Sequence, residues 1–267
     1  MALYHLILLA VVQGITEFLP VSSSGHLILL PNALGTADQG QFLDVSVHVG
    51  TLGAVILYFW KDVRGALLGL PALARGNTND PGARLALLLI IATIPVIFFG
   101  VFLALTGLND LLRSVAVIGW TMLGFGLVLW WADRRGAQTL RTEDWSMKHA
   151  IQMGLWQAIA LIPGTSRSGI TITGARALGY DRESSARLAI LMSIPAIIAS
   201  GGYLLLDTGL YLTGPQARDA AIAAVLAFGA ALLALKLMMR LLQSVSFTPY
   251  VIYRVCLGLI LLYVAYS

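Results

Sequence analysis

Apolar stretches close to 20 residues long recur through almost the whole chain, and they limit its fold more than any other feature. A helix of that length crosses a hydrocarbon layer of about 30 Å. Of the 267 residues, 58% are hydrophobic and only 11% are charged, whereas soluble domains carry about 25% charged residues. We therefore expect an all-α polytopic membrane protein that forms a single membrane domain over residues 1–267.

Six stretches have the length and composition of membrane-spanning helices, namely 43–60, 84–106, 114–131, 188–206, 218–242 and 249–266. Shorter apolar segments form two pairs, 3–19 with 22–36 and 147–162 with 168–178. A break rich in Pro, Ser and Gly separates the members of each pair. Because broken backbone at membrane depth needs protein or a water-filled cavity around it, we predict that both pairs are re-entrant half-helices.

The two breaks resemble each other in sequence. QGITEFLPVSSSG (13–25) and QAIALIPGTSRSG (157–169) align without gaps and share Gln, Ile, two Ser and a Gly. A further phrase, ATIPVI at 92–97, resembles MSIPAI at 192–197. With one re-entrant pair and three spanning helices in each half, the second half must be inverted relative to the first. The halves are expected at approximately 1–132 and 147–267.

Basic residues predict the orientation. Of the 17 Lys and Arg residues, fourteen lie in the connections 61–84, 132–148 and 176–187 or near the turn before the last helix, Arg176 and Arg254 among them. Only Arg113 and Arg218 lie on the opposite side, and Arg167 lies inside the second break. Since cytoplasmic loops are enriched in Lys and Arg, both termini are expected on the outer side of the membrane.

The first break collects polar groups that a membrane helix rarely carries. Gln13 and Glu17 share a helix face, and Pro20 ends that helix. The serines that follow favour the start of a new helix, whose N–H groups bind anions such as phosphate; these are Ser22, Ser23 and Ser24, followed by Gly25 and His26. Close helix packing explains small residues such as Ser22 and Ser24 equally well, but it explains the ionisable Glu17 and His26 poorly.

The second break supplies a cation. Arg167 is flanked by Thr165, Ser166, Ser168 and Gly169, and its guanidinium suits bidentate binding of phosphate. A structural Arg167–Glu17 ion pair is the alternative, and it is compatible with a phosphate site.

Other features carry weaker signals. Asp44 and His48 share a helix face, where they form either a supporting pair behind the site or a helix-packing contact. Tyr250 and Tyr253 are expected in an aromatic belt at the membrane surface. Glycines at 119, 124 and 126 suggest a helix-packing face or a homodimer. No basic, aromatic-interleaved stretch indicates nucleic-acid binding.

These motifs resemble the undecaprenyl-pyrophosphate phosphatase family of the bacitracin-resistance type. QGITEFLPVSSSGHL is similar to that family's (E/Q)xxxE motif with its Ser-rich, Gly-His segment, and PGTSRSGITIT and FLDVSVHVGTLGAV are similar to two further stretches. The resemblance covers nearly the full length. It implies a bacterial inner-membrane enzyme, with periplasmic termini, that removes the terminal phosphate of a C55 polyprenyl diphosphate and recycles the carrier lipid for wall synthesis.

The resemblance also implies a divalent cation, Mg²⁺ or Ca²⁺, for which Glu17 is the one firm carboxylate ligand. Gln13 stands where some members carry Glu, so the acid–base role is expected at Glu17. A second class of membrane lipid phosphatase resembles the chain only through SSSGH. That class needs a histidine six residues after its arginine, and Thr173 occupies this position here.

Two mechanisms fit these residues. In both, Arg167, Ser166, Thr165 and backbone N–H groups bind the phosphates. Either Ser23 attacks phosphorus with His26 or Glu17 as base, or His26 protonates the leaving oxygen while Glu17 and a divalent ion activate water. A polyprenyl-phosphate flippase or small-molecule transporter is the alternative function, because inverted repeats with broken helices are also transporter architecture.

Overall fold

The computed structural model describes residues 3–23, 25–27, 41–108, 112, 114–208 and 214–267, without the side chains of 41, 203–208 and 215. Within these residues the fold is helical, and no β-strand occurs. The elements are α1 (Leu3–Thr16), α3 (Gln41–Tyr58), α4 (Trp60–Ala74), α5 (Pro81–Thr106), α7 (Val115–Arg135), η1 (Thr142–Asp144), α8 (Met147–Ile159), α9 (Arg167–Ala177), α10 (Arg182–Thr208), α11 (Gly214–Leu241) and α12 (Thr248–Tyr266).

The predicted spanning helices correspond to α3, α5, α7, α10, α11 and α12. In the described part of the chain, five helices are long and apolar enough to cross a membrane, and the bent pair α3–α4 makes a sixth if it counts as one span. The protein is therefore an integral membrane protein. The half-helices predicted at 3–19, 147–162 and 168–178 correspond to α1, α8 and α9, whereas most of 22–36 lies outside the described residues.

Helix α4 lies where the sequence predicted only a connection. Its first turns carry charge, and Pro71 lies inside it, so the segment resembles a loop. The helix turns by 89° from α3 and packs against α5 in a hairpin. Gly69 allows this contact, because a Cβ there would collide with the backbone of Gly82 and Ala83.

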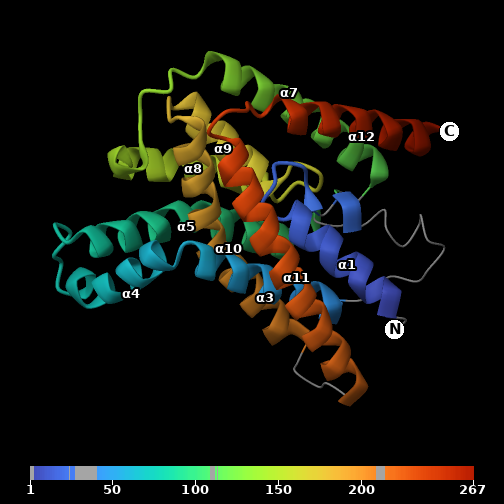
Figure 1. Ribbon diagram of the computed structural model, residues 1–267, viewed down its shortest axis with the longest axis horizontal. Coiled ribbons are helices and arrows are strands. Elements are labelled where there is room, and N and C mark those ends of the chain that lie inside the picture. The colour runs from blue at the N-terminus through green and yellow to red at the C-terminus, as the bar shows by residue number, and fades with distance from the viewer. Residues whose placement is uncertain (1–2, 24, 28–40, 109–111, 113, 209–213) are drawn as a thin grey trace.

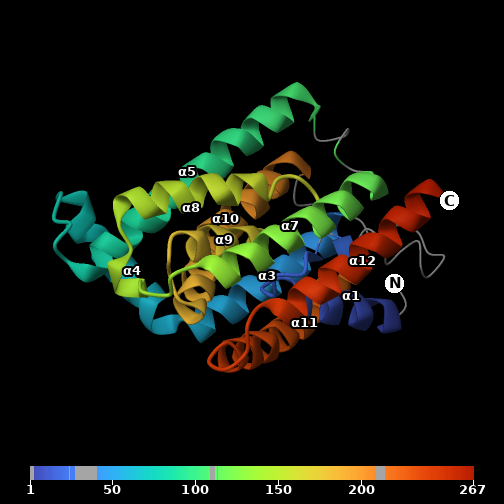
Figure 2. The same ribbon diagram turned by 90° about the horizontal axis from the view of Figure 1, so that it is seen from above.

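Helix α9 is the central element of the bundle. It packs against α7, α8 and α10, while α11 lies along α1 and α3, and α12 lies along α7 (Figures 1 and 2). The whole stretch 168–176 is buried. Figures 1 and 2 place the start of α1 and the end of α12 toward one end of the molecule and α4 toward the other.

A buried ion cluster fixes the C-terminal end of α9. Arg176 is fully buried, and its Nε lies 3.0 Å from Oδ1 of Asp133 on α7. Arg182 donates to the same carboxylate at 2.9 Å, and the backbone N–H of Phe247 donates to it at 3.3 Å. Arg176 was counted among the basic residues of the connection 176–187, and it lies in the last turn of α9, where its charge is neutralised inside the bundle.

The proline phrases do not support the predicted repeat. ATIPVI lies in α5 and MSIPAI lies in α10. In the predicted repeat each half begins with a broken pair. Helix α10 is then the counterpart of α3, because each is the first spanning helix after its pair, and α5 comes later. The two phrases therefore lie in helices that are not counterparts. The sequence likeness between the halves comes from the two breaks alone.

Candidate active site at two helix breaks

The first break turns the chain between α1 and a new helical turn. Pro20 has no N–H for a helical hydrogen bond, and residues 17–21 form turns. Ser22 then adopts a left-handed conformation with φ 72°. Its Oγ accepts a hydrogen bond from the N–H of Gly25 at 3.4 Å, so Ser22 caps the helix that begins at Ser23.

The second break repeats this backbone geometry. Ser166 has φ 69°, and its Oγ accepts from the N–H of Gly169 at 3.1 Å where α9 begins. A left-handed conformation costs an ordinary residue about 1–2 kcal/mol. In the described part of the chain only one other non-glycine residue, Gln138, has a positive φ. Strain of this kind gathers at functional sites, and here it occurs at two serines that occupy equivalent places.

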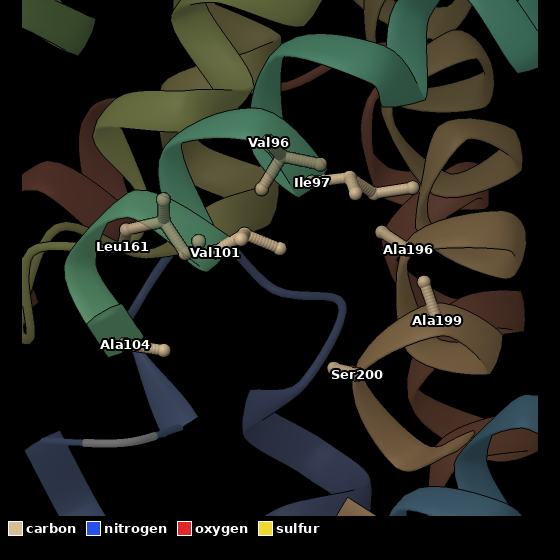
Figure 3. Close-up of a pocket in the computed structure, with 9 residues that line it drawn as sticks. Val96, Ile97, Val101, Ala104, Leu161, Ala196, Ala199 and Ser200 are labelled. Carbon is tan, nitrogen blue, oxygen red and sulfur yellow. The ribbon is translucent and has the colours of Figure 1, made fainter. Parts of the chain in front are cut away.

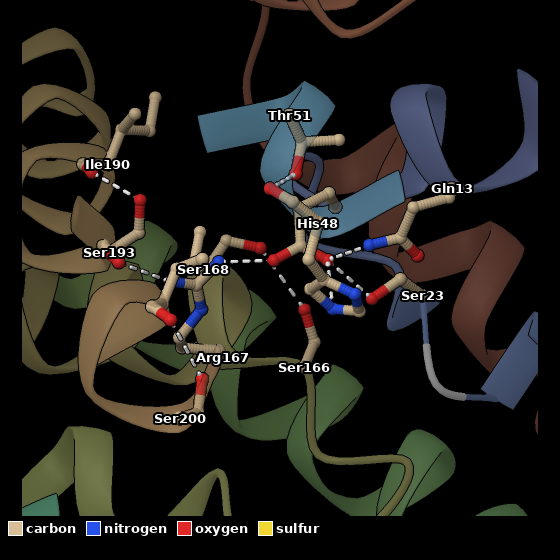
Figure 4. A network of polar contacts seen from close by, with 12 residues as sticks. Gln13, Ser23, His48, Thr51, Ser166, Arg167, Ser168, Ile190, Ser193 and Ser200 are labelled. Atoms are coloured by element: carbon tan, nitrogen blue, oxygen red, sulfur yellow. Dashed lines mark hydrogen bonds and ion pairs between the residues drawn. The ribbon is translucent and has the colours of Figure 1, made fainter. Parts of the chain in front are cut away.

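Glu17 contacts residues of both breaks. Figure 4 shows three of the side chains that contact it, Gln13, Ser23 and Arg167. Its side chain is buried, and Nη2 of Arg167 donates to Oε1 at 2.5 Å. Gln13 Nε2 and Ser23 Oγ donate to Oε2 at 2.7 and 2.9 Å. His48 Nε2 lies 3.7 Å from the same oxygen. The predicted carboxylate, hydroxyl and guanidinium therefore form one polar cluster.

Two backbone carbonyls complete the link between the breaks. Arg167 Nη1 donates to the carbonyl of Ser193 on α10 at 3.0 Å, and Ser168 Oγ donates to the carbonyl of Leu19 at 2.9 Å. Arg167 is thus held on one side by α10 and on the other by Glu17. The guanidinium is oriented before any substrate arrives.

The side chain of His26 contacts Ser22 and Tyr253 rather than Ser23. Its Nδ1 lies 2.7 Å from the carbonyl of Ser22, which can only accept, so Nδ1 carries a proton. Nε2 then accepts from the hydroxyl of Tyr253 at 2.5 Å, and the two rings are stacked 5.6 Å apart. Tyr253 was expected in an aromatic belt, and this contact instead places it at the site. Glu17, rather than His26, is positioned to take the proton of Ser23.

The hydroxyls predicted to bind phosphate are mostly turned inward. Thr165 is fully buried, and its hydroxyl has no hydrogen-bond partner among the described residues. Ser22, Ser166 and Ser168 are also buried, whereas Ser24 lies outside the described residues. The anion-binding groups that this geometry favours are the first N–H groups of α9, since no carbonyl within the helix accepts from them.

Arg254 lies beside the second break, although it was counted only among the basic residues near the turn before the last helix. It lies within that helix, α12, and is fully buried. Its Nη2 donates to the carbonyls of Thr165 at 2.8 Å and Gly164 at 3.3 Å. No carboxylate of the described residues pairs with it, in contrast to buried Arg176. An arginine inside an apolar helix was itself the signal that could have identified it.

Gly169 makes room for this guanidinium. A Cβ at position 169 would lie 2.7 Å from Nη1 of Arg254, an atom that has no partner among the described residues. Gly169 therefore has a packing role in addition to its N–H in the cap. Because Glu17 balances the charge of Arg167, the uncompensated positive charge at the second break comes from Arg254.

His48 contacts the backbone carbonyl of Asp44. One prediction from the sequence was a pair between these two residues behind the site. His48 Nδ1 donates to the carbonyl of Asp44 at 2.7 Å. This bond directs Nε2 toward Glu17, so His48 lies beside the Glu17 cluster.

The donor set fits a resident divalent cation poorly. Across the described ranges no group of three His, Cys, Asp or Glu side chains could hold a metal ion. Both oxygens of Glu17 already accept hydrogen bonds, and the nearest charge is the guanidinium of Arg167. A carboxylate neutralised in this way makes a weak ligand for a hard cation.

Comparison with known proteins supports the family resemblance of the motifs. The family model described as "Bacitracin resistance protein BacA" matches residues 6–260. Proteins named undecaprenyl-diphosphatase from Jannaschia sp. (strain CCS1) and Ruegeria pomeroyi are 68% and 66% identical to this chain, with all of both chains covered. One with the same name from Maricaulis maris is 47% identical over 98% of each chain. The chain therefore belongs to the bacitracin resistance protein BacA family.

Proposed function

We propose that this protein hydrolyses undecaprenyl diphosphate to undecaprenyl monophosphate and inorganic phosphate. The reaction recycles the carrier lipid for cell-wall synthesis, and it confers bacitracin resistance. The observation that carries the proposal is the contact of Ser23 and Arg167 with the two oxygens of Glu17, in a family whose full-length relatives are named for this reaction. The transporter alternative has no comparable support.

In the proposed reaction Ser23 is the nucleophile. Its Oγ attacks the terminal phosphorus, the bond from that phosphorus to the bridging oxygen breaks, and undecaprenyl monophosphate leaves. Glu17 accepts the proton of Ser23. Water then attacks the phosphoserine, which releases phosphate and restores the serine. His26 holds the carbonyl of Ser22, and we assign it a positioning role for the turn that carries Ser23.

Positive charge at the second break stabilises the phosphoryl group. Arg167 exchanges its contact with Glu17 for phosphate oxygens, and the first N–H groups of α9 bind further oxygens. Arg254 lies too deep to touch the substrate. It acts through the Gly164 and Thr165 carbonyls that it holds and through its charge.

An apolar cavity beside the second break suits the lipid tail (Figure 3). It has a volume of about 260 Å³ and lies between α5 and α10, where Val96, Ile97 and Ala196 line it. Leu161, which precedes the break by two residues, also lines it. We assign the first isoprene units of the substrate to this cavity.

The divalent cation implied by the family resemblance is proposed to arrive with the diphosphate. Mg²⁺ or Ca²⁺ binds phosphate oxygens well, whereas the described protein ligands around Glu17 fit it poorly.

The membrane arrangement is proposed from the helices and charges. Both pairs, α1 with the segment beginning at Ser23 and α8 with α9, would be re-entrant, in inverted halves of a single membrane domain. The bacterial inner membrane would contain the protein with both termini periplasmic. A homodimer would need a face other than Gly119 and Gly126, because these glycines pack against α12 of the same chain.

Single cysteines test this orientation. Cys256 is exposed and is the only cysteine of the chain, so it is first replaced by Ala. Cysteines introduced at Asn77 and Thr139 should react with a membrane-impermeant reagent only from the cytoplasmic side, and one at Gly214 only from the periplasmic side. Labelling at 77 and 214 from the reversed sides would contradict the orientation.

Phosphate release tests the function itself. Purified protein should release one inorganic phosphate from each undecaprenyl diphosphate, and the lipid product should be the monophosphate. The Ser23→Ala variant, purified in the same way, controls for contaminating phosphatases. Equal release by both proteins, or none by the parent, would refute the proposal.

A further inference from the structure

A further cavity, lined by several charged side chains, lies at the C-terminal end of α3. It has a volume of about 640 Å³ and is surrounded by the α3–α4 bend and by side chains of α10 and α11. We call it the basic pocket, and its charged lining residues are Lys61, Asp62, Glu183, Arg187, Lys236 and Arg240. Tyr58 lines it ten residues after His48, which corresponds to about 15 Å along a helix. It is therefore separate from the Glu17 cluster.

The charges of the basic pocket are not balanced within the protein. Two carboxylates face four cations, and one of these cations is already bound, since Arg187 Nη2 donates to both oxygens of Asp62 at 2.7 and 2.8 Å. Arg187 Nε is buried without a partner among the described residues. Within the same residues, Lys61, Lys236 and Arg240 form no ion pair. An anion would find uncompensated cations from two sides of the pocket.

The surroundings indicate an anion that carries hydrocarbon. Lys236 and Arg240 are one helical turn apart on α11. Beside them Leu233, Leu237 and Leu241 are exposed, at 59%, 51% and 48% of their surface. Exposed leucines on a membrane-spanning helix face lipid tails, so the cations lie where lipid headgroups meet the protein. Basic pockets between membrane helices bind the headgroups of anionic lipids.

We propose that the basic pocket binds the phosphate headgroup of an anionic phospholipid. The phosphate lies between Lys236 and Arg240 on α11 and Lys61 at the start of α4, and the acyl chains follow the leucines of α11. A bound headgroup would link α4 to α11 at the bend after α3. The site does not depend on the proposed hydrolysis.

Direct binding tests this proposal. Purified full-length protein in a neutral detergent is titrated with dioctanoyl phosphatidylglycerol, dioctanoyl phosphatidylcholine and inorganic phosphate. The double variant Lys236→Gln/Arg240→Gln removes two pocket charges. Arg64→Gln/Arg75→Gln, on and just after α4, removes the same charge from positions that do not line the pocket. Thermal unfolding midpoints verify that both variants are folded.

Phosphatidylglycerol should bind the parent and the Arg64/Arg75 variant with similar Kd, and the Lys236/Arg240 variant about tenfold more weakly. Phosphatidylcholine and inorganic phosphate should bind the parent at least about tenfold more weakly than phosphatidylglycerol. Phosphatidylcholine lacks the net negative charge, and inorganic phosphate lacks the hydrocarbon chains. Equal weakening in both variants would mean a general surface charge effect. Equal binding of phosphatidylcholine or of free phosphate would overturn the lipid site.

Discussion

The two breaks share one backbone geometry, but they present side chains of opposite charge. In each, a serine with φ near 70° caps a helix through its own hydroxyl. The first break presents Glu17 and Ser23, to which we assign proton transfer and attack, and His26, to which we assign the positioning of the turn. The second presents Arg167 and is supported by Arg254 from α12, which supply positive charge. In the proposed reaction both breaks are needed, because neither alone supplies a nucleophile, a base and a cation.

We therefore assign the chemical step to the first break and the binding of diphosphate to the second. The groups of the first break are arranged around one carboxylate, so losing any of them should affect turnover. The groups of the second break are held by backbone carbonyls of Ser193, Gly164 and Thr165, so their loss should affect the affinity for diphosphate and its transition state.

Replacing the nucleophile should have the largest effect. Ser23→Ala should lower kcat by about 10⁴-fold or more, because no other group can form the covalent intermediate. Acid quenching of the parent with ³²P-labelled substrate should trap phosphate on Ser23. If Ser23 only binds phosphate, its loss removes one hydrogen bond to a charged group, about 1–3 kcal/mol or roughly one to two decades of rate. A loss of that size without trapped label would favour water as the nucleophile.

Removing the cation of the second break should come next. Arg167→Ala should lower kcat/KM about a thousandfold, since the transferred phosphoryl group loses its charge-assisted hydrogen bonds. Arg167→Lys should restore little, because a point charge cannot replace the planar fork. Membrane fractionation verifies insertion. Near-normal turnover of the alanine variant would place the phosphate site elsewhere.

Displacing Arg254 should have a smaller effect on activity, because Arg254 does not touch the substrate and acts through the Gly164 and Thr165 carbonyls. In Gly169→Ala the new methyl group would press on Nη1 of Arg254, and we expect KM to rise about tenfold to a hundredfold, with a smaller change in kcat. Gly124→Ala is the matched control, since nothing lies within 4 Å of its added Cβ. Equal effects of both substitutions, or a loss confined to kcat, would contradict the role given to Arg254.

The contact between His26 and α12 should have the smallest effect. Tyr253→Phe removes one hydrogen bond while the ring stacking remains, which corresponds to about 1 kcal/mol or roughly a fivefold loss. The loss should appear in kcat with KM unchanged, because His26 positions the turn that carries Ser23. A change in KM alone would assign Tyr253 to substrate binding.

The sequence was sufficient for the class of fold and for the two motifs. Apolar length predicted α5, α7, α10, α11 and α12 because the membrane sets that length. It failed at α4, where charges and Pro71 hide a helix that is stabilised by its packing on α5. Glu17 and Arg167 carried local signals in the sequence, and the structure brings these two side chains into contact.

The contributions of α12 could not be read from a motif. Tyr253 and Arg254 are close to the breaks only because α12 packs along α7 and α9 lies against α7. Contacts over such sequence distances depend on the packed bundle. The direction of the hydroxyls was unpredictable for the same reason, since Thr165 resembles a phosphate ligand in sequence but is buried in the structure.

The central claim is that Glu17 restrains the cation that the substrate needs. The most direct measurement is the Kd of a non-hydrolysable polyprenyl methylenediphosphonate for the parent, Glu17→Gln and Arg167→Ala proteins. Removing the carboxylate charge 2.5 Å from Arg167 should free the guanidinium. Glu17→Gln should therefore bind the analogue about tenfold more tightly than the parent although it hydrolyses diphosphate poorly, since charges this close interact by several kcal/mol in a partly buried site. Arg167→Ala should bind it at least about tenfold more weakly. Weaker binding by Glu17→Gln, or unchanged binding by Arg167→Ala, would contradict the division of work between the two breaks.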